Sequence, residues 1–254
     1  MKYLIIIFLI IFNGSLYSRE TGQTEITAED GVEVFQKEKY YLLKKNVKII
    51  SDDFTLNGDE VKMYFDKDLY DIKEIESWGN VSIQSNKYDV FGEGDHLIFL
   101  VITEDLLIEG VKSKLLTNNM EMFSDGVIKI NNLSGQFSLT GPNSILNSED
   151  ININGEKING IFADNAGTNE ILELSVYDKN LAYIKSDNTD MYAINAVYDK
   201  KTSIIELEDE VKIIRDGETI TGDYGTLDTE SQSYQVKSRN SNKVKVIIIS
   251  DENE

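Results

Sequence analysis

Apolar and polar residues alternate along most of this chain, so that every second side chain is apolar over many short stretches. Turn-forming pairs such as Asn57-Gly58 and Asp216-Gly217 separate these stretches. This pattern is typical of half-buried strands joined by tight turns. Helical spacing of apolar residues is absent beyond the N-terminal stretch, so the sequence predicts an all-β sandwich, barrel, jelly roll or β-solenoid. The clearest alternating stretches are residues 47–49, 61–65, 128–130, 151–153 and 244–249.

A frame of fourteen residues occurs three times: "NVKIISDDFTLNGD" (46–59), "NVSIQSNKYDVFGE" (80–93) and "EVKIIRDGETITGD" (210–223). Each copy predicts a hairpin with a two-residue loop, at 52–53, 86–87 and 216–217. Pairing outward from these loops gives one apolar pair and then one valine–glycine pair per hairpin. The pairs are Ile49 with Leu56, Val47 with Gly58, Ile83 with Val90, Val81 with Gly92, Ile213 with Ile220, and Val211 with Gly222.

The apolar positions change parity beyond the repeated glycine. In the first copy they are Phe54 and Leu56 before the glycine, and Val61 and Met63 after it. Because side chains alternate strictly along a strand, this change requires a bulge or bend. We interpret the three glycines as bend points that keep both halves of a long strand apolar on one inner surface. They are Gly58, Gly92 and Gly222.

Residues 125–143 and 150–164 repeat the frame weakly, and residues 182–209 repeat it with Ala193 in place of the glycine; no linker composition interrupts them. The sequence therefore predicts one continuous array of hairpins over residues 19–254. Residues 4–12 are an unbroken apolar run, about 14 Å of helix against about 30 Å of bilayer core. This predicts a cleaved signal peptide over residues 1–18, with an uncleaved membrane anchor as the alternative. The formal net charge of -20 argues against a nucleic-acid partner, and the absence of cysteine excludes disulfides.

The segment "LEDEVKIIRDGETITGDYGTLDTESQSYQV" (207–236), followed by "NKVKVIII", resembles the OstA-like repeat of the LptA family of periplasmic lipopolysaccharide-transport proteins. The stronger copies cover about 25–110 and 182–250. This resemblance implies an open, twisted β-jelly roll of repeated antiparallel hairpins. Its apolar interior would hold the acyl chains of lipid A. Such a protein would bridge the inner and outer membranes in the periplasm.

Carried onto this chain, the resemblance implies a lipid groove and two edge strands for partners. The edges are residues 26–35 and 243–249, with Val244, Val246 and Ile248 as partner contacts. The implied partners are lipopolysaccharide, LptC-like and LptD-like proteins, and further copies stacked head to tail. The groove residues are Val47, Ile49, Leu56, Met63, Val81, Ile83, Val90, Leu97, Val211, Ile213, Ile220 and Leu227.

Catalytic chemistry has little support in the residues. The single histidine, His96, has no partner cluster for a metal and no nucleophile beside it; Asp95 reads as a loop acid. The segment from Asp150 starts like a calcium loop but has Ile161 where a bidentate glutamate is required. We expect no enzyme activity, no cofactor and no built metal site, and leave open a surface calcium near Asp150.

Three other functions stay open at this point. An LptC-type partner anchored in the inner membrane would share the fold. A secreted structural or adhesive β-solenoid would have a filled interior and no ligand. A polysaccharide-acting enzyme would need two facing carboxylates, and no feature of the sequence marks such a pair. Trp78 and the tyrosines could stack on sugars, although packing is the more ordinary role of such residues in strands.

Overall fold

The computed structural model describes residues 22–85, 87, 89–165, 168–239 and 243–248. They form eighteen antiparallel strands in one sheet, and no helix of the described chain is long and apolar enough to cross a membrane. The predicted signal peptide, residues 1–18, lies outside the described residues. The strands are β1 Glu25–Thr27, β2 Val32–Phe35, β3 Tyr40–Ile50, β4 Phe54–Phe65, β5 Ile72–Ser85, β6 Val90–Leu100, β7 Asp105–Glu109, β8 Ser113–Leu116, β9 Met120–Ser124, β10 Val127–Asn131, β11 Gln136–Ser148, β12 Ile151–Asn165, β13 Thr168–Ser186, β14 Thr189–Asp199, β15 Ile204–Arg215, β16 Glu218–Asp228, β17 Tyr234–Lys237 and β18 Lys245–Ile248.

Each long strand is bent in the middle and contributes to two layers. Residues 54–58 of β4 pair with 47–50 of β3, whereas residues 60–65 pair with 40–44, with a register shift between Lys44 and Val47. The same shift recurs in the other long hairpins. Layer A contains residues 25–27, 47–50, 54–58, 81–85, 90–94, 113–116, 120–124, 144–148, 151–154, 182–186, 189–193, 211–215, 218–222 and 245–248. Layer B contains residues 32–35, 40–44, 60–65, 72–78, 96–100, 105–109, 127–131, 136–140, 157–161, 173–177, 195–199, 204–208, 224–228 and 234–237.

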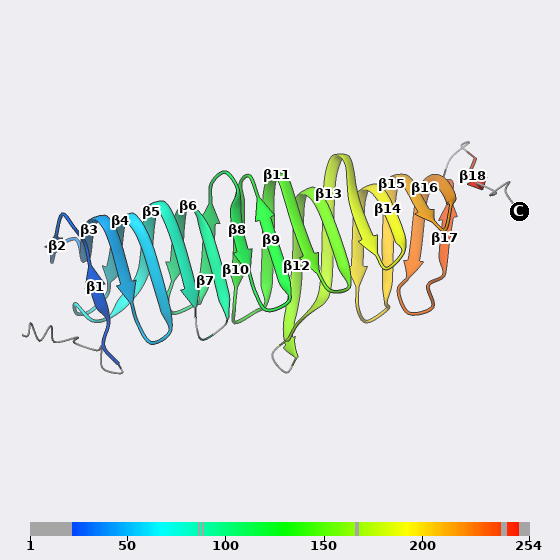
Figure 1. Ribbon diagram of the computed structural model, residues 1–254. Helices are drawn as coiled ribbons and strands as arrows, with labels where there is room; N and C mark the ends of the chain where they lie inside the picture. The colour runs from blue at the N-terminus through cyan, green and yellow to red at the C-terminus, as the bar shows by residue number, and fades with distance from the viewer. Residues whose placement is uncertain (1–21, 86, 88, 166–167, 240–242, 249–254) are drawn as a thin grey trace, which may run out of the picture.

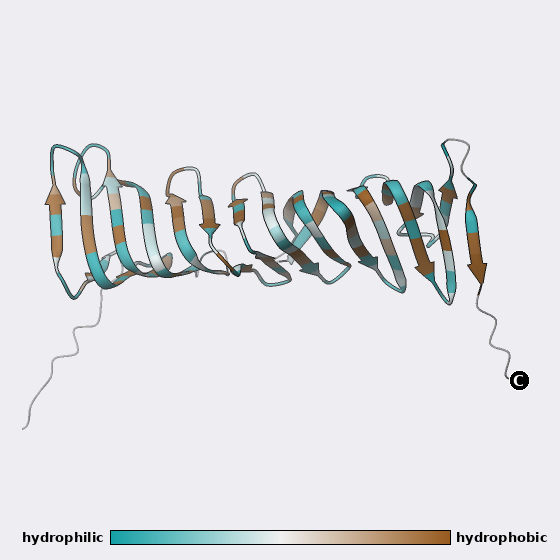
Figure 2. Ribbon diagram, turned by 90° about the horizontal axis from the view of Figure 1, so that it is seen from above, coloured by the Kyte–Doolittle hydropathy of each residue, from teal (hydrophilic) through white to brown (hydrophobic). Residues whose placement is uncertain are grey.

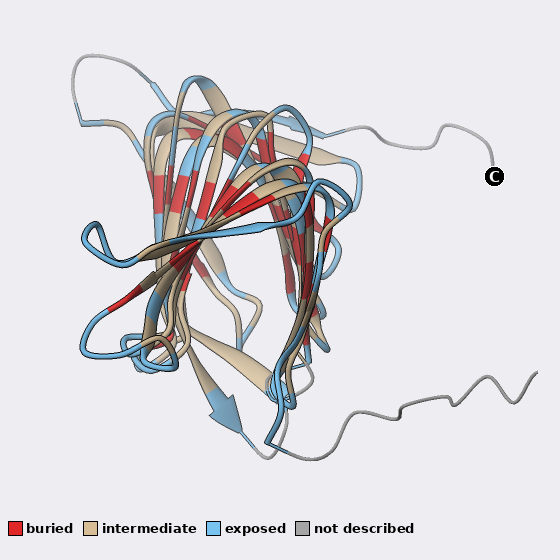
Figure 3. Ribbon diagram, turned by 90° about the vertical axis from the view of Figure 1, so that its left-hand side faces the viewer, coloured by how far each residue is buried: buried red, intermediate tan, exposed pale blue. Residues whose placement is uncertain are grey.

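The two layers make an elongated trough. They join along the line of bends, which we call the seam, and the hairpin turns line the opposite side, which we call the mouth. Figure 1 shows β1 and β2 at one end and β17 and β18 at the other. Figure 3 looks along this axis and shows buried residues in both layers. The predicted all-β, open jelly roll of repeated hairpins is confirmed.

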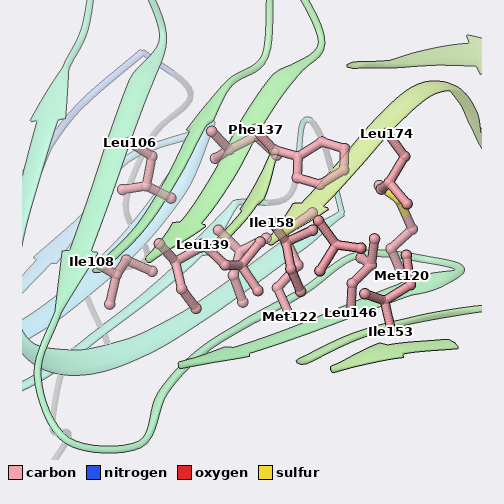
Figure 4. Close-up of a cluster of buried hydrophobic side chains, with 14 of the residues drawn as sticks. Leu106, Ile108, Met120, Met122, Phe137, Leu139, Leu146, Ile153, Ile158 and Leu174 are labelled. Atoms are coloured by element: carbon pink, nitrogen blue, oxygen red, sulfur yellow. The ribbon is translucent and has the colours of Figure 1, made fainter. Parts of the chain in front are cut away.

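Alternate side chains of both layers point between them and form one continuous apolar cluster from Leu43 to Leu227. Hydrophilic residues alternate with hydrophobic ones along the strands, as the banded colouring of Figure 2 shows. Figure 4 shows the middle of the cluster, where Met122 and Leu146 of layer A lie near Ile158 of layer B. Each fully buried side chain of this size contributes about 1.5–3 kcal/mol of transfer free energy, so the interior holds the layers together.

Two of the three predicted hairpin registers are confirmed. Ile49 lies opposite Leu56, and Ile213 lies opposite Ile220. In the third hairpin, the two turn residues Asp216 and Gly217 both have positive φ, 47° and 81°, as a type I′ turn requires.

The middle hairpin is shifted by two residues from the prediction. Ser85, and not Ile83, lies opposite Val90, so the connection spans residues 86–89. Ile83 is therefore opposite Gly92, and Val81 is opposite Gly94. The predicted pairs Ile83–Val90 and Val81–Gly92 are wrong because the sequence pattern does not distinguish a two-residue connection from a four-residue one.

The bends of β4, β6 and β16 lie at Gly-Asp pairs, but these glycines do not have positive φ. Gly58-Asp59 and Gly222-Asp223 lie at the bends of β4 and β16, as predicted. In β6 the bend is at Gly94-Asp95 and not at Gly92, because of the register shift. The left-handed residues lie instead on neighbouring strands, in pairs such as Lys45-Asn46 and Asp209-Glu210.

The bend glycines are required by close approach. A Cβ on Gly58 would lie 2.1 Å from Oγ of Ser77, and one on Gly222 would lie 2.5 Å from Cγ1 of Val236. A side chain at Gly58 or Gly222 would therefore collide with a neighbouring strand at the seam.

The acids of the bends bind the next bend along the seam. Nδ2 of Asn80 donates to Oδ2 of Asp59 at 2.8 Å, and the backbone N of Val111 donates to Oδ2 of Asp95 at 3.2 Å. At the far end, the backbone N of Arg239 donates to Oδ2 of Asp223 at 3.0 Å. The acids at these three bends therefore tie neighbouring segments of the seam together.

Candidate functional site

The predicted groove residues all lie on the inner faces of the two layers. Eleven of the twelve are at most 5% exposed, and Ile220 is half-buried. Met63, Leu97 and Leu227 come from layer B, and the other nine come from layer A. Sequence reasoning missed the middle of the same surface, where the frame is weak and plain alternation was the available signal. The missed residues include Leu106, Ile108, Leu115, Met120, Met122, Ile128, Leu139, Leu146, Ile153 and Ile158.

The inner side chains of the two layers pack against each other. Ile49, Leu56 and Ile213 are buried almost completely. An acyl chain that enters between the layers must therefore displace side chains or separate the layers at the mouth. Contact of these twelve residues with a lipid remains a prediction.

Near the N-terminal end, a small cavity of about 90 Å³ opens at the mouth between the layers. Phe54 of layer A and Phe99 of layer B meet edge to face there, with ring centroids 5.9 Å apart. Nζ of Lys87 lies 3.1 Å from Oε1 of Glu104 across the rim. The cavity exposes inner apolar surface beneath a charged rim, which suits the chain of an amphiphile.

A second cavity of about 480 Å³ lies at the mouth farther along the trough. Its wall includes amide and hydroxyl groups from Asn119, Thr168 and Ser186 and acids at Glu149 and Asp150, beside apolar groups such as Ile151. Asp150 lies in the turn before β12, and residues 151–165 continue as one strand. Within the described residues, no group of three or more metal-binding side chains comes together.

A third cavity of about 820 Å³ lies on the outer face of layer B, from β6 to β14. Leu107, Lys129 and Val197 line it, and each alternates with a buried inner residue on its strand. This cavity is therefore separate from the predicted lipid groove, and sequence analysis gave no sign of it.

His96 lies on the outer face of layer B. Its Nε2 is 3.0 Å from Oε1 of Glu76, its Nδ1 is 3.4 Å from Oε2 of Glu109, and its ring stacks on Trp78 at 5.4 Å. Asp95, beside it, accepts the seam hydrogen bond from Val111. These contacts give both residues a structural role.

The predicted N-terminal edge strand is in fact two strands, because the chain bends between them. β1 and β2 both pair with β3, one in each layer, and β17 and β18 likewise both pair with β16. Residues of the end strands remain exposed although they point to the inner side of their layer. Val32 is 50%, Val34 46%, Val246 51% and Ile248 66% exposed. Val244 is also exposed, and residue 249 lies outside the described chain. Both ends of the interior are thus uncapped in the described chain.

These features define the chain as an all-β, open jelly roll with an apolar inner face and uncapped ends. No protein-family model and no curated protein matches its sequence. In structure the chain is similar to LptH, the LptA-homologous periplasmic component of the lipopolysaccharide transport device of Pseudomonas aeruginosa. The two share 15% sequence identity at a TM-score of 0.43, over 52% of this chain and 95% of that one.

Proposed function

We propose that this protein is a periplasmic bridge that carries lipopolysaccharide from the inner to the outer membrane along the inner faces of its two layers. The observation that carries the proposal is the continuous apolar surface between the layers, which reaches both ends of the trough. At those ends, Val32 and Val246 leave the same surface exposed. The resemblance of residues 207–236 to the OstA-like repeat supports the same function.

The chemistry of transport is that of burial alone. An acyl chain gains about 0.8 kcal/mol for each methylene that leaves water, and this requires no catalytic group. The charged outer faces keep the protein in solution, while the sugar headgroup stays at the mouth. The acyl chains enter from the mouth, where Phe54 and Phe99 border inner surface, and part the two layers locally.

The end strands provide the route between membranes. A strand at the end of a sheet can pair with a strand of another chain through backbone hydrogen bonds. β1 and β2 at one end, and β17 and β18 at the other, would pair with LptC-like and LptD-like proteins or with further copies of this chain. A cleaved signal peptide over residues 1–18 would place the protein in the periplasm; an uncleaved one would make it an LptC-type anchored partner.

A second function is favoured by the packing of the interior. Leu56, Leu97 and Leu139 are fully buried by the protein's own side chains. A structural or adhesive β-solenoid without a ligand would have such an interior along its whole length.

Site-specific photo-crosslinking separates the two functions. A photoreactive residue at Ile213 faces the interior, whereas one at Lys212, the preceding residue, points outward beside the ring of Tyr192. If lipopolysaccharide passes between the layers, Ile213 labels it at least several times more strongly than Lys212. Equal labelling, with both variants folded by circular dichroism, would favour the structural solenoid.

A further inference from the structure

The hairpin of β12 and β13 is longer than its neighbours and projects from layer B at the mouth (Figure 1). We call its described residues 162–165 and 168–171 the strap. Within it Phe162 pairs with Ile171, whereas the preceding residue, Ile161, pairs with Glu173. Leu172 is therefore an extra residue in the ladder, and such a bulge bends a hairpin. The strap leaves the plane of layer B at this point.

The strap reaches layer A and is held there by two hydrogen bonds. Nδ2 of Asn119 donates to the backbone O of Asn169 at 2.7 Å, and the backbone N of Asn169 donates to Oδ1 of Asn119 at 3.0 Å. Asn119 belongs to the turn between β8 and β9, in layer A. Glu170 of the strap forms an ion pair with Lys200, which directly follows the layer B part of β14. The strap thus crosses the mouth from one layer to the other.

The underside of the strap is apolar. Phe162 and Ile171 are directly opposite each other, partly buried, and packed against the interior cluster. The ring of Phe162 lies 6.3 Å, centroid to centroid, from that of Phe137, an inner residue of layer B. The strap therefore inserts its own hydrocarbon at a place where the interior would otherwise face the mouth.

We propose that the strap covers an acyl-chain site, and that Phe162 and Ile171 occupy the place of the ligand's hydrocarbon chain while the strap is closed. This inference rests on the proposed function. A ligand binds when the strap is lifted about its bulge at Leu172. The polar cavity beside the strap then takes the headgroup, which its amide and hydroxyl groups suit if the headgroup is a sugar.

The charge around that cavity sets a further limit on the ligand. Glu149, Asp150 and Asp187 line it, against the single cation Lys200, which is paired with Glu170. The carboxylates around the cavity repel an anionic group that enters it. The part of the headgroup that enters the cavity is therefore a neutral hydroxylated ring, with any phosphate held outside in solvent.

The experiment locks and releases the strap. The natural chain has no cysteine, so the double variant Asn119→Cys/Asn169→Cys can be joined selectively by a short thiol-cleavable bifunctional reagent. The probes are a fluorescent long-chain fatty acid and purified lipopolysaccharide. We expect the linked protein to lose binding of both probes and the cleaved protein to regain it. Asn119→Ala, which removes both tethering bonds, should bind the fatty acid about tenfold more tightly.

Asn147→Ala is the matched control, because Asn147 makes one long side-chain bond, 3.5 Å to Glu121, on the outer face of layer A. It should bind both probes like the natural protein. The strap proposal is overturned, and the transport function stands, if the linked and cleaved proteins bind the probes equally while a photoreactive residue in place of Ile213 still labels lipopolysaccharide. If no form of the protein binds either probe, and the photoreactive residue in place of Ile213 does not label lipopolysaccharide, both the strap proposal and the transport function fail.

Discussion

Nδ2 of Asn143 donates a hydrogen bond to Oδ2 of Asp125 at 2.6 Å, joining the bend of β11 to the connection between β9 and β10. The backbone N of Lys112 donates to the other oxygen, Oδ1, at 2.9 Å. These bonds, that from Asn143 first, lower the pKa of Asp125. At this point of the seam, the carboxylate of Asp125 therefore binds two neighbouring segments, the bend of β11 and the connection between β7 and β8.

Low pH should destabilise the protein at the seam, and Asp125→Ala should remove part of this loss of stability. Because the folded state lowers the pKa of Asp125, its contribution to stability is present above the pKa of the unfolded chain and is lost as the pH falls through the folded value. The natural protein should be more stable than the variant at pH 7, and the difference should vanish at low pH. The measurement is the urea midpoint against pH. A difference for Asp125→Ala that stays constant with pH would contradict the prediction.

Much of the fold could be predicted because alternation is a local property. The bends of β4 and β16 were found from the change in parity beyond Gly58 and Gly222. The bend at Gly94 was missed because residues 86–89 form a four-residue connection. Apolar alternation fits a two-residue and a four-residue connection equally well. The close contact of Gly58 with Ser77 is between strands, so no local pattern reports it.

The candidate site was predicted only in part for the same reason. Inner-facing residues can be predicted because side chains alternate between the two faces of a strand, and all twelve groove residues lie at inner-facing positions. Whether a trough is open or filled depends on how far apart the two layers lie, and that distance is a tertiary property. The strap was missed because Asn119 and Asn169 are 50 residues apart, so their bonds leave no periodic signal.

A double-mutant cycle should expose the fit between Gly58 and Ser77. Oγ of Ser77 is buried and has no hydrogen-bond partner among the described residues, and it lies 2.1 Å from where a Cβ on Gly58 would be. Gly58→Ala alone should destabilise the protein by about 1–3 kcal/mol through overpacking. Ser77→Ala alone should be neutral or stabilising by about 1 kcal/mol, because it removes an unsatisfied buried hydroxyl.

Combined, the two substitutions should restore most of the lost stability, because the Cβ of Ser77 is 3.5 Å from the added methyl, an ordinary contact. Urea denaturation of the four proteins measures the coupling. Additive effects of the two changes would show that the glycine is needed for backbone freedom and not for space.

Tyr183 should titrate unusually late among the tyrosines. Its hydroxyl donates to Oδ1 of Asp190 at 2.7 Å, and this bond, followed by burial, raises the pKa of Tyr183 to about 12. The contribution of the bond to stability is complete below the unfolded pKa of about 10 and is lost as the pH rises through the folded value. Ultraviolet absorbance of phenolate against pH should show one high transition, which Asp190→Ala lowers and Tyr183→Phe removes. An unchanged curve in Asp190→Ala would show that the bond does not govern the titration.

The uncapped ends should make the protein associate end to end. Val246 and Ile248 leave inner-face surface exposed on β18, as Val32 and Val34 do on β2. Sheets that end in such strands bury them against another chain unless charge prevents it. Sedimentation velocity should show assemblies that grow with concentration, and Val246→Glu/Ile248→Glu should leave monomers. Val197→Glu, equally exposed but on the outer face of layer B, should assemble like the natural protein, because the contact is between ends. Loss of assembly in this control as well would indicate association through the outer faces.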